Sequence, residues 1–121
     1  MSDVRRLVVC DDEPEFRAYI RRAAESMGFE VRETGDPTAC ADLVRAFGPD
    51  ILVLDIVMPG MDGIEVVQAV AAAGYSGRVL LTSGYDPNYM TSAARLAAIK
   101  GVRTEILPKP VRLDALRAAL S

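Results

Sequence analysis

The sequence predicts an α/β fold with a doubly wound, five-stranded parallel sheet. Short apolar runs of strand length alternate with segments of helical periodicity along the 121 residues. Residues 51–54 are apolar throughout, which is typical of a strand covered by helices on both faces. Strict alternation of strands and helices implies right-handed crossovers between parallel neighbours. These observations favour one open sheet with helices packed on its two faces.

The predicted strands have two kinds of sequence signal. Phe29 and Val31 alternate with the charged Glu30 and Arg32, which indicates a strand at or near an edge of the sheet. The third run is continuously apolar and belongs in the middle of the sheet. The strands are predicted at residues 7–10, 29–34, 51–54, 79–81 and 104–107.

The segments between these runs carry helical spacing and recognisable ends. Asp36 and Pro37 predict a helix start, because aspartate caps a helix and proline fits its first turn. Gly28 and Gly48 are natural helix ends. The five helices are predicted at about residues 16–27, 37–47, 64–71, 87–100 and 113–120.

Composition excludes several classes of function. The net charge of −3 gives no support for a surface that binds nucleic acid or a membrane, and no apolar stretch approaches the roughly 20 residues that cross a bilayer. No signal peptide precedes the first run. We expect Cys10 and Cys40 to be buried thiols, which fits a cytoplasmic location. The absence of histidine excludes histidine triads, histidine metal ligands and phosphohistidine chemistry within this chain.

Polar residues follow four of the five apolar runs. Because the carboxyl ends of parallel strands meet at one edge of a sheet, we expect these residues to share one pocket. They are Asp11 and Asp12, Asp55, Thr82 and Ser83, and Lys109.

Three carboxylates at one edge predict a divalent metal site. Asp11, Asp12 and Asp55 would repel one another unless a cation compensates their charge. Ligands that are all oxygen suit Mg²⁺. The alternative is that Asp11 and Asp12 only cap the next helix. Their expected convergence with Asp55 and Lys109 favours the metal site.

Asp55 is the predicted nucleophile of this pocket. A carboxylate can accept a phosphoryl group and form an aspartyl phosphate. Mg²⁺ and the ammonium of Lys109 would neutralise the charge of the transferred group. Pro110 permits a cis peptide bond after Lys109, which would direct the lysine side chain into the pocket.

A hydroxyl at the end of the fourth run would hydrogen-bond the phosphoryl group. Thr82 and Ser83 are both candidates, but successive strand residues point to opposite faces. We favour Ser83, because Gly84 follows it and leaves room for the backbone. Thr82 remains the alternative.

The polar residues of this pocket stand in four motifs: D-D-E-P at residues 11–14, L-D-I-V-M-P-G-M-D-G at 54–63, T-S-G at 82–84 and L-P-K-P at 107–110. Together these motifs resemble the receiver domain of two-component response regulators, over essentially the whole chain. The resemblance implies a flavodoxin-like fold with strand order 2-1-3-4-5, five helices and a single receiver domain over residues 1–121. The segment between Ser83 and Lys109 is a few residues longer than usual and resembles receivers with a long fourth-helix segment.

The resemblance also implies a role for each residue of the pocket. Asp55 would be the phosphoacceptor and a metal ligand. Asp12 would bind Mg²⁺ directly, Asp11 mainly through water, and Val57 through its backbone carbonyl. Lys109 would contact the phosphoryl group.

Further positions are implied to control the response. Ser83 would act as the switch hydroxyl. Val57 and Tyr85 would flank the acceptor, where they could hinder the hydrolytic water and lengthen the phosphoryl lifetime. Ile106 stands at a switch position where receivers commonly carry an aromatic side chain, so the usual aromatic readout is not expected here.

The implied function is that of a signalling module and not of an enzyme. A histidine kinase or a histidine phosphotransfer protein would phosphorylate Asp55, and the phosphorylated domain would switch a surface around the fourth helix and fifth strand. The effector is unknown, and a phosphorylation-dependent dimer is a further expectation. A phosphorylation-independent pseudo-receiver that only binds partners is the alternative. An aspartate-based phosphatase of the haloacid-dehalogenase type is disfavoured, because its D-x-D motif is absent: Val57 follows Asp55 at that spacing.

Overall fold

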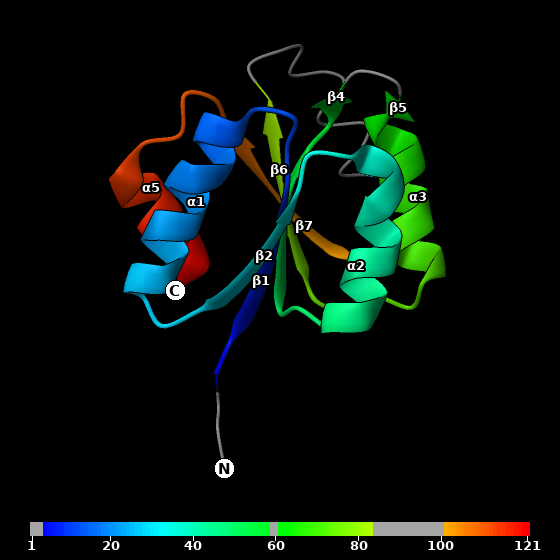
Figure 1. Cartoon of the computed structure of the whole chain (residues 1–121), viewed down its shortest axis with the longest axis horizontal. Coiled ribbons are helices and arrows are strands. Elements are labelled where there is room, and N and C mark those ends of the chain that lie inside the picture. Colours follow the sequence, from blue (N-terminus) through cyan, green and yellow to red (C-terminus); the bar gives the residue numbers. More distant parts are fainter. Residues whose placement is uncertain (1–3, 59–60, 84–100) are drawn as a thin grey trace.

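A five-stranded parallel sheet forms the centre of the computed structural model, which describes residues 4–58, 61–83 and 101–121 (Figure 1). The order β2-β1-β3-β6-β7 is the 2-1-3-4-5 order of flavodoxin-like folds, as predicted. Every neighbouring pair is parallel. The strands are β1 (Arg6–Cys10), β2 (Glu30–Thr34), β3 (Ile51–Asp55), β6 (Arg78–Ser83) and β7 (Arg103–Pro108).

Helices cover both faces of the sheet. Figure 1 shows α1 and α5 on one side of the sheet and α2 and α3 on the other. The helix predicted at residues 87–100 lies outside the described residues. The described helices are α1 (Pro14–Ser26), α2 (Cys40–Phe47), α3 (Gly63–Ala72) and α5 (Leu113–Leu120). None of them is long and apolar enough to cross a membrane.

The sheet divides the core into two layers. Residues 7–10 of β1 and 51–54 of β3 alternate between the two layers, and all of them are buried. Val8 and Leu52 belong to the layer under α2 and α3, whereas Leu7 and Val53 belong to the layer under α1 and α5. Burial on both faces explains why these strands are apolar throughout.

The edge strand and the two thiols agree with the sequence. Phe29 and Val31 are buried, whereas Glu30 and Arg32 are exposed. Cys10 and Cys40 are free and buried. A hydrogen bond with Cys40, together with burial, raises the pKa of Cys10 well above its ordinary value.

Two local details differ from the predictions. The segment after Asp36 begins as a 3-10 turn, η1 (Pro37–Ala39), and α2 starts only at Cys40. The Asp36 carboxylate accepts a hydrogen bond from the Thr38 N–H at 2.9 Å, so it caps the turn. Between β3 and α3, where the sequence predicts neither strand nor helix, the chain forms two short antiparallel strands, β4 (Val57–Met58) and β5 (Met61–Asp62).

Candidate functional site

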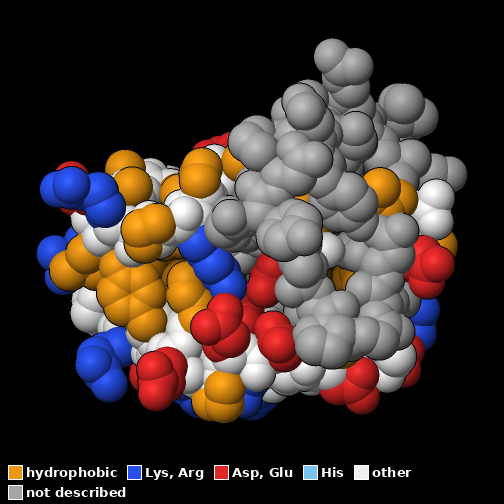
Figure 2. Space-filling model, turned by 90° about the horizontal axis from the view of Figure 1, so that it is seen from above, with side chains coloured by type: hydrophobic (Ala, Val, Ile, Leu, Met, Phe, Trp, Pro, Cys, Tyr) orange, Lys and Arg blue, Asp and Glu red, His pale blue; other side chains and the backbone are white. Residues whose placement is uncertain are grey.

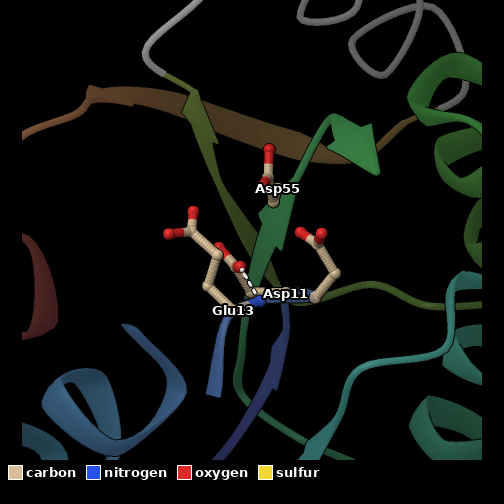
Figure 3. Close-up of side chains that lie close together, drawn as sticks. Asp11, Glu13 and Asp55 are labelled. Carbon is tan, nitrogen blue, oxygen red and sulfur yellow. Dashed lines mark hydrogen bonds between the residues drawn. The ribbon is translucent and has the colours of Figure 1, made fainter. Parts of the chain in front are cut away.

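Four carboxylates meet at the carboxyl edge of the sheet. Asp11 follows β1, Asp12 and Glu13 continue into the loop before α1, and Asp55 ends β3. One carboxylate oxygen from each lies within 4.8 Å of those of the others. The side chains of Asp11, Glu13 and Asp55 lie close together in Figure 3. Asp11 is 0% exposed and Asp55 is 4% exposed, so the pocket holds charge that water barely reaches.

Lys109 supplies a positive charge to this cluster from the end of β7. Its Nζ lies 2.9 Å from Asp11 Oδ2, 3.0 Å from Glu13 Oε1 and 3.3 Å from Asp55 Oδ2. Burial alone would lower the pKa of Lys109, but hydrogen bonds to Asp11 and Glu13 and the charge of Asp55 raise that pKa above its ordinary value. The ammonium therefore stays charged at neutral pH.

Asp11 also organises the loop that carries the acidic residues. Its Oδ1 accepts a hydrogen bond from the Glu13 N–H at 2.8 Å, while Oδ2 pairs with Lys109. The N-cap residue of α1 is Glu13, whose own side chain makes no capping bond. Asp11 therefore does not cap α1: its carboxylate holds the loop before the helix and takes part in the acidic cluster.

Sequence analysis predicted no role for Glu13, although this residue is the third of the D-D-E-P motif. Its side chain is 64% exposed and reaches back to the Lys109 ammonium. The ring of Phe16 lies on another side of that ammonium, 4.3 Å from Nζ to the ring centroid. These contacts link residues nearly 100 positions apart, so spacing within a motif could not reveal them.

The two candidate switch residues, Thr82 and Ser83, are the last two residues of β6. Thr82 is fully buried, and its hydroxyl donates to the Leu54 carbonyl at 3.5 Å. In the sheet register Thr82 is the partner of Asp55, and Ser83 is the partner of Pro108. Both residues therefore belong to the edge of the sheet that carries the acidic cluster.

The remaining predicted positions have different placements. Val57 lies in β4, two residues beyond Asp55. Ile106 lies in β7 and is 40% exposed. The Lys109–Pro110 peptide bond is cis, the isomer that the sequence permits. Tyr85 lies outside the described residues.

The donor set fits a hard divalent cation. Carboxylates supply all four potential ligands, and two of these groups are buried beside one another. Hard cations such as Mg²⁺ and Ca²⁺ prefer oxygen ligands. The acidic cluster is of the kind that forms the Mg²⁺ site of receiver domains.

The chain belongs to the response regulator receiver domain family, whose family model matches residues 7–121. It is thus the receiver domain of a two-component response regulator, a regulatory phosphoacceptor rather than an enzyme. It is 30% identical over 115 residues to the response regulator MprA of Mycobacterium avium, covering 95% of this chain and 49% of MprA. The chain therefore spans about half the length of that relative.

Solved structures show the same fold. The signal receiver domain of the putative response regulator NarL from Mycobacterium tuberculosis is 34% identical, with a TM-score of 0.78 over 98% of this chain and 94% of that one. A response regulator protein from Burkholderia pseudomallei is 21% identical, with a TM-score of 0.80 over 97% and 66%. That structure contains a phosphorylated aspartic acid and a calcium ion.

Proposed function

We propose that Asp55 is the phosphoacceptor and takes a phosphoryl group from a phosphohistidine of a partner protein. The observation that carries this proposal is the placement of its nearly buried carboxylate, 3.3 Å from the Lys109 ammonium and within the acidic cluster. In the transfer, an Asp55 carboxylate oxygen forms the new P–O bond. The P–N bond to the donor histidine breaks, and the imidazole nitrogen keeps its electron pair.

Lys109 and a bound Mg²⁺ together would balance the charge of the transferred group. The Lys109 ammonium already contacts Asp55 and is held in place by Asp11 and Glu13. Phosphoryl transfer depends mainly on positioning and on neutralisation of charge. When bound, Mg²⁺ would supply further positive charge to the acidic cluster.

The metal ligands follow from how each carboxylate is already used. Asp12 is exposed beside the cluster, which supports a role as a direct ligand. Both oxygens of Asp11 are engaged, one by the Glu13 N–H and one by Lys109, which supports a role through water. Asp55 and the backbone carbonyl of Val57 complete the proposed set.

A hollow beside the acceptor offers a contact surface for the donor. It is open, has a volume of about 560 Å³, and is lined by aromatic, aliphatic, acidic and basic side chains. Figure 2 shows hydrophobic side chains beside the basic and acidic groups on this face. We propose that a histidine kinase or histidine phosphotransfer protein docks here. The lining residues are Glu13, Glu15, Phe16, Tyr19, Lys109, Pro110 and Val111.

The response to phosphorylation would run through the end of β6 and through β7. Ser83 is the proposed switch hydroxyl and Thr82 its alternative. The hydrogen bond from the Thr82 hydroxyl to the Leu54 carbonyl favours Ser83 as the switch residue. Thr82 would have to break this bond before its hydroxyl could turn toward the phosphoryl group. Ile106 is a proposed switch position, and its partly exposed side chain could change environment. A downstream effector or a phosphorylation-dependent dimer would read that change.

Two further proposals concern the lifetime of the phosphoryl group and the location of the domain in the cell. Val57 and Tyr85 would slow hydrolysis by shielding the acyl phosphate from water, so Tyr85→Ala should lose its label faster than the native protein. Slower loss in the variant would overturn this idea. We also expect one receiver domain over residues 1–121, acting in the cytoplasm, where free thiols such as Cys10 and Cys40 persist.

Intact mass spectrometry tests the central proposal. The protein is incubated with acetyl phosphate, with and without Mg²⁺, beside Asp55→Asn. We expect one phosphoryl adduct that requires Mg²⁺ and is lost in the variant. If acetyl phosphate gives no adduct, a phosphohistidine donor is tried. Failure with both donors would contradict phosphorylation and favour the pseudo-receiver that only binds partners.

A further inference from the structure

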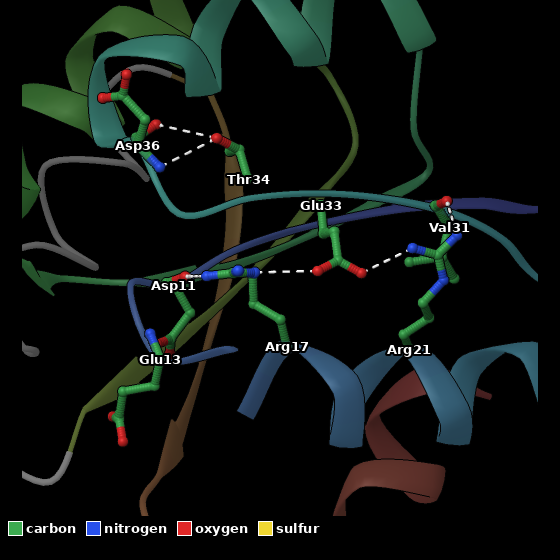
Figure 4. A network of polar contacts seen from close by, with 8 residues as sticks. All are labelled: Asp11, Glu13, Arg17, Arg21, Val31, Glu33, Thr34 and Asp36. Carbon is green, nitrogen blue, oxygen red and sulfur yellow. Dashed lines mark hydrogen bonds and ion pairs between the residues drawn. The ribbon is translucent and has the colours of Figure 1, made fainter. Parts of the chain in front are cut away.

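Arg17 connects the acidic loop to the edge strand β2. From the first turns of α1, its Nη1 donates to the backbone carbonyl of Asp11 at 2.7 Å. Its Nε contacts Glu33 Oε1 at 3.0 Å. The side chain is 18% exposed, so the guanidinium is largely shielded from water. Figure 4 shows the guanidinium between the Asp11 carbonyl and the Glu33 carboxylate.

Glu33 gives this arginine a fixed point. Its second carboxylate oxygen lies 2.7 Å from Arg21 Nη1, one helical turn after Arg17. Hydrogen bonds from Arg21 and then Arg17 hold the pKa of Glu33 below its ordinary value, although burial opposes them. The Glu33 carboxylate therefore remains ionised and keeps Arg17 oriented toward Asp11.

Gly35 provides the space that the guanidinium occupies. A Cβ atom at this position would lie 2.7 Å from Arg17 Nη1, 3.4 Å from Arg17 Cζ and 3.6 Å from the Asp11 carbonyl oxygen. A free arginine end could move aside, but this one is held by both Asp11 and Glu33. Glycine at position 35 thus permits the contact between α1 and the acidic loop.

We infer that Arg17 is a positioning residue that sets the affinity of the acidic cluster for a divalent cation. It reaches the cluster through the Asp11 backbone, whose N–H donates to the Thr34 carbonyl at 3.1 Å and whose carbonyl accepts from Arg17. Because the N–H and the carbonyl of Asp11 are both hydrogen-bonded, its backbone is fixed and its carboxylate is directed toward Lys109. The carboxylate of the neighbouring Asp12 lies close to that of Asp11. This inference rests on the proposed Mg²⁺ site.

The physical reason is repulsion among the acidic side chains. Four carboxylates within 4.8 Å of one another favour a loop that spreads apart when no metal is bound. The Arg17 guanidinium opposes this spreading, because it adds positive charge close to the loop and anchors its backbone. Groups that orient metal ligands in this way change metal affinity by about 10- to 100-fold when they are removed.

Calorimetric titration with Mg²⁺ alone tests this role in the full chain. Arg17→Lys keeps the charge, but a single ammonium cannot bridge Asp11 and Glu33 as the guanidinium does. We expect its Mg²⁺ Kd to rise about tenfold. Gly35→Ala displaces the guanidinium without changing any charge, and we expect a Kd shift in the same direction. Arg21→Lys is the matched control, because Arg21 contacts Glu33 but not Asp11, and its Kd should change less than about twofold.

The thermal unfolding midpoint of each variant separates positioning from general loss of stability. Titrations are performed well below each midpoint, and Gly77→Ala, at the opposite end of the sheet, serves as a destabilised control with unchanged Kd. A native Mg²⁺ Kd in both Arg17→Lys and Gly35→Ala would overturn the inference about Arg17 but not the proposed metal site. If one variant does not fold, the other decides. Absence of Mg²⁺ binding by the native protein would overturn the proposed metal site and this inference together.

Discussion

The two ends of the central sheet are both rich in charged side chains, but they balance that charge differently. At the carboxyl end, the carboxylates of Asp11, Glu13 and Asp55 all contact the single ammonium of Lys109. Asp12 adds a further acidic group to the same cluster. Negative charge is therefore in excess where β1, β3 and β7 end.

At the amino end, polar groups close the connections between helices and strands. Arg78 pairs with Glu105 at 2.6 Å and donates to the Ala119 carbonyl at 2.6 Å. The Tyr75 hydroxyl donates to the Arg78 carbonyl at 2.7 Å. Burial raises the pKa of Tyr75 above its ordinary value, so the phenol stays protonated and keeps this bond. The contacts of Arg78 join β6 to β7 and to α5, and the Tyr75 bond closes the turn that leads into β6.

The comparison indicates that polar contacts at the amino end of the sheet stabilise the fold, whereas the charged groups at the carboxyl end serve binding and phosphoryl transfer. At the amino end, charged side chains pair with opposite charges, and side-chain donors bind backbone carbonyls. The carboxyl end keeps like charges close together, which is costly without a cation and useful once a cation and a phosphoryl group bind. Changes at the two ends should therefore have different signatures.

Lys109→Ala should have the largest effect, because it removes the cation from the acidic cluster. We expect phosphoryl uptake from acetyl phosphate to fall about 100-fold. Without Mg²⁺ the free energy of unfolding should fall by about 3 kcal/mol, since buried carboxylates lose their partner. Mg²⁺ should restore part of that loss. Urea unfolding with and without Mg²⁺ and an uptake time course measure these effects.

Arg112→Ala is the matched control for Lys109→Ala. Arg112 is a cation only three residues away, but its side chain is 82% exposed and pairs with the exposed Asp114. Uptake and the response to Mg²⁺ should stay native in this variant. Equal losses in the two variants would show that net charge, and not the position of Lys109, is responsible.

Gly77→Ala should weaken the opposite end of the sheet. A Cβ atom there would overlap the Tyr75 hydroxyl and lie 2.7 Å from the Asp50 backbone carbonyl oxygen. We expect the free energy of unfolding to fall by about 1–3 kcal/mol, because the Tyr75 ring must move. Phosphoryl uptake at 25 °C should remain native while the protein stays folded. A large loss of uptake by the folded variant would remove the distinction between the two ends.

Glu33→Gln should have the smallest effect on stability, and this effect should appear as a change in the pH dependence of unfolding. Because the folded-state pKa of Glu33 lies below its ordinary value of 4.5, its contribution to stability is present above that value. The contribution is lost as pH falls through the lower folded-state pKa. We expect it to be under about 1 kcal/mol. Unfolding midpoints from pH 7 to 3 should show a shallower acid limb in the variant than in the native protein.

Most of the fold follows from patterns that a sequence displays locally. The apolar runs that became β1 and β3 are continuous because both faces of each strand are buried. The acidic pocket was predictable for the same reason: once the strands are parallel, Asp11, Asp55 and Lys109 must end at one edge. Neither conclusion requires knowledge of side-chain conformation.

The features that the sequence missed depend on contacts across the chain. The ion pair of Glu13 with Lys109 and the bridge from Arg17 to Glu33 require the reach and orientation of long side chains. The antiparallel pairing of β4 with β5 depends on how the chain after Asp55 folds back on itself. Each of these strands has only two residues, which is too short for a periodic pattern to predict it.

The most direct test follows backbone amide chemical shifts while Mg²⁺ and beryllofluoride, a mimic of a phosphoryl group, are added. We predict the largest changes at residues 11–13, Asp55 and Lys109, and native shifts at Asp50 and residues 74–78. The same additions to Asp55→Asn should leave no beryllofluoride-dependent change. Equal changes at both ends of the sheet, or none around Asp55 at saturating Mg²⁺ and beryllofluoride, would contradict a phosphoacceptor site at the carboxyl end.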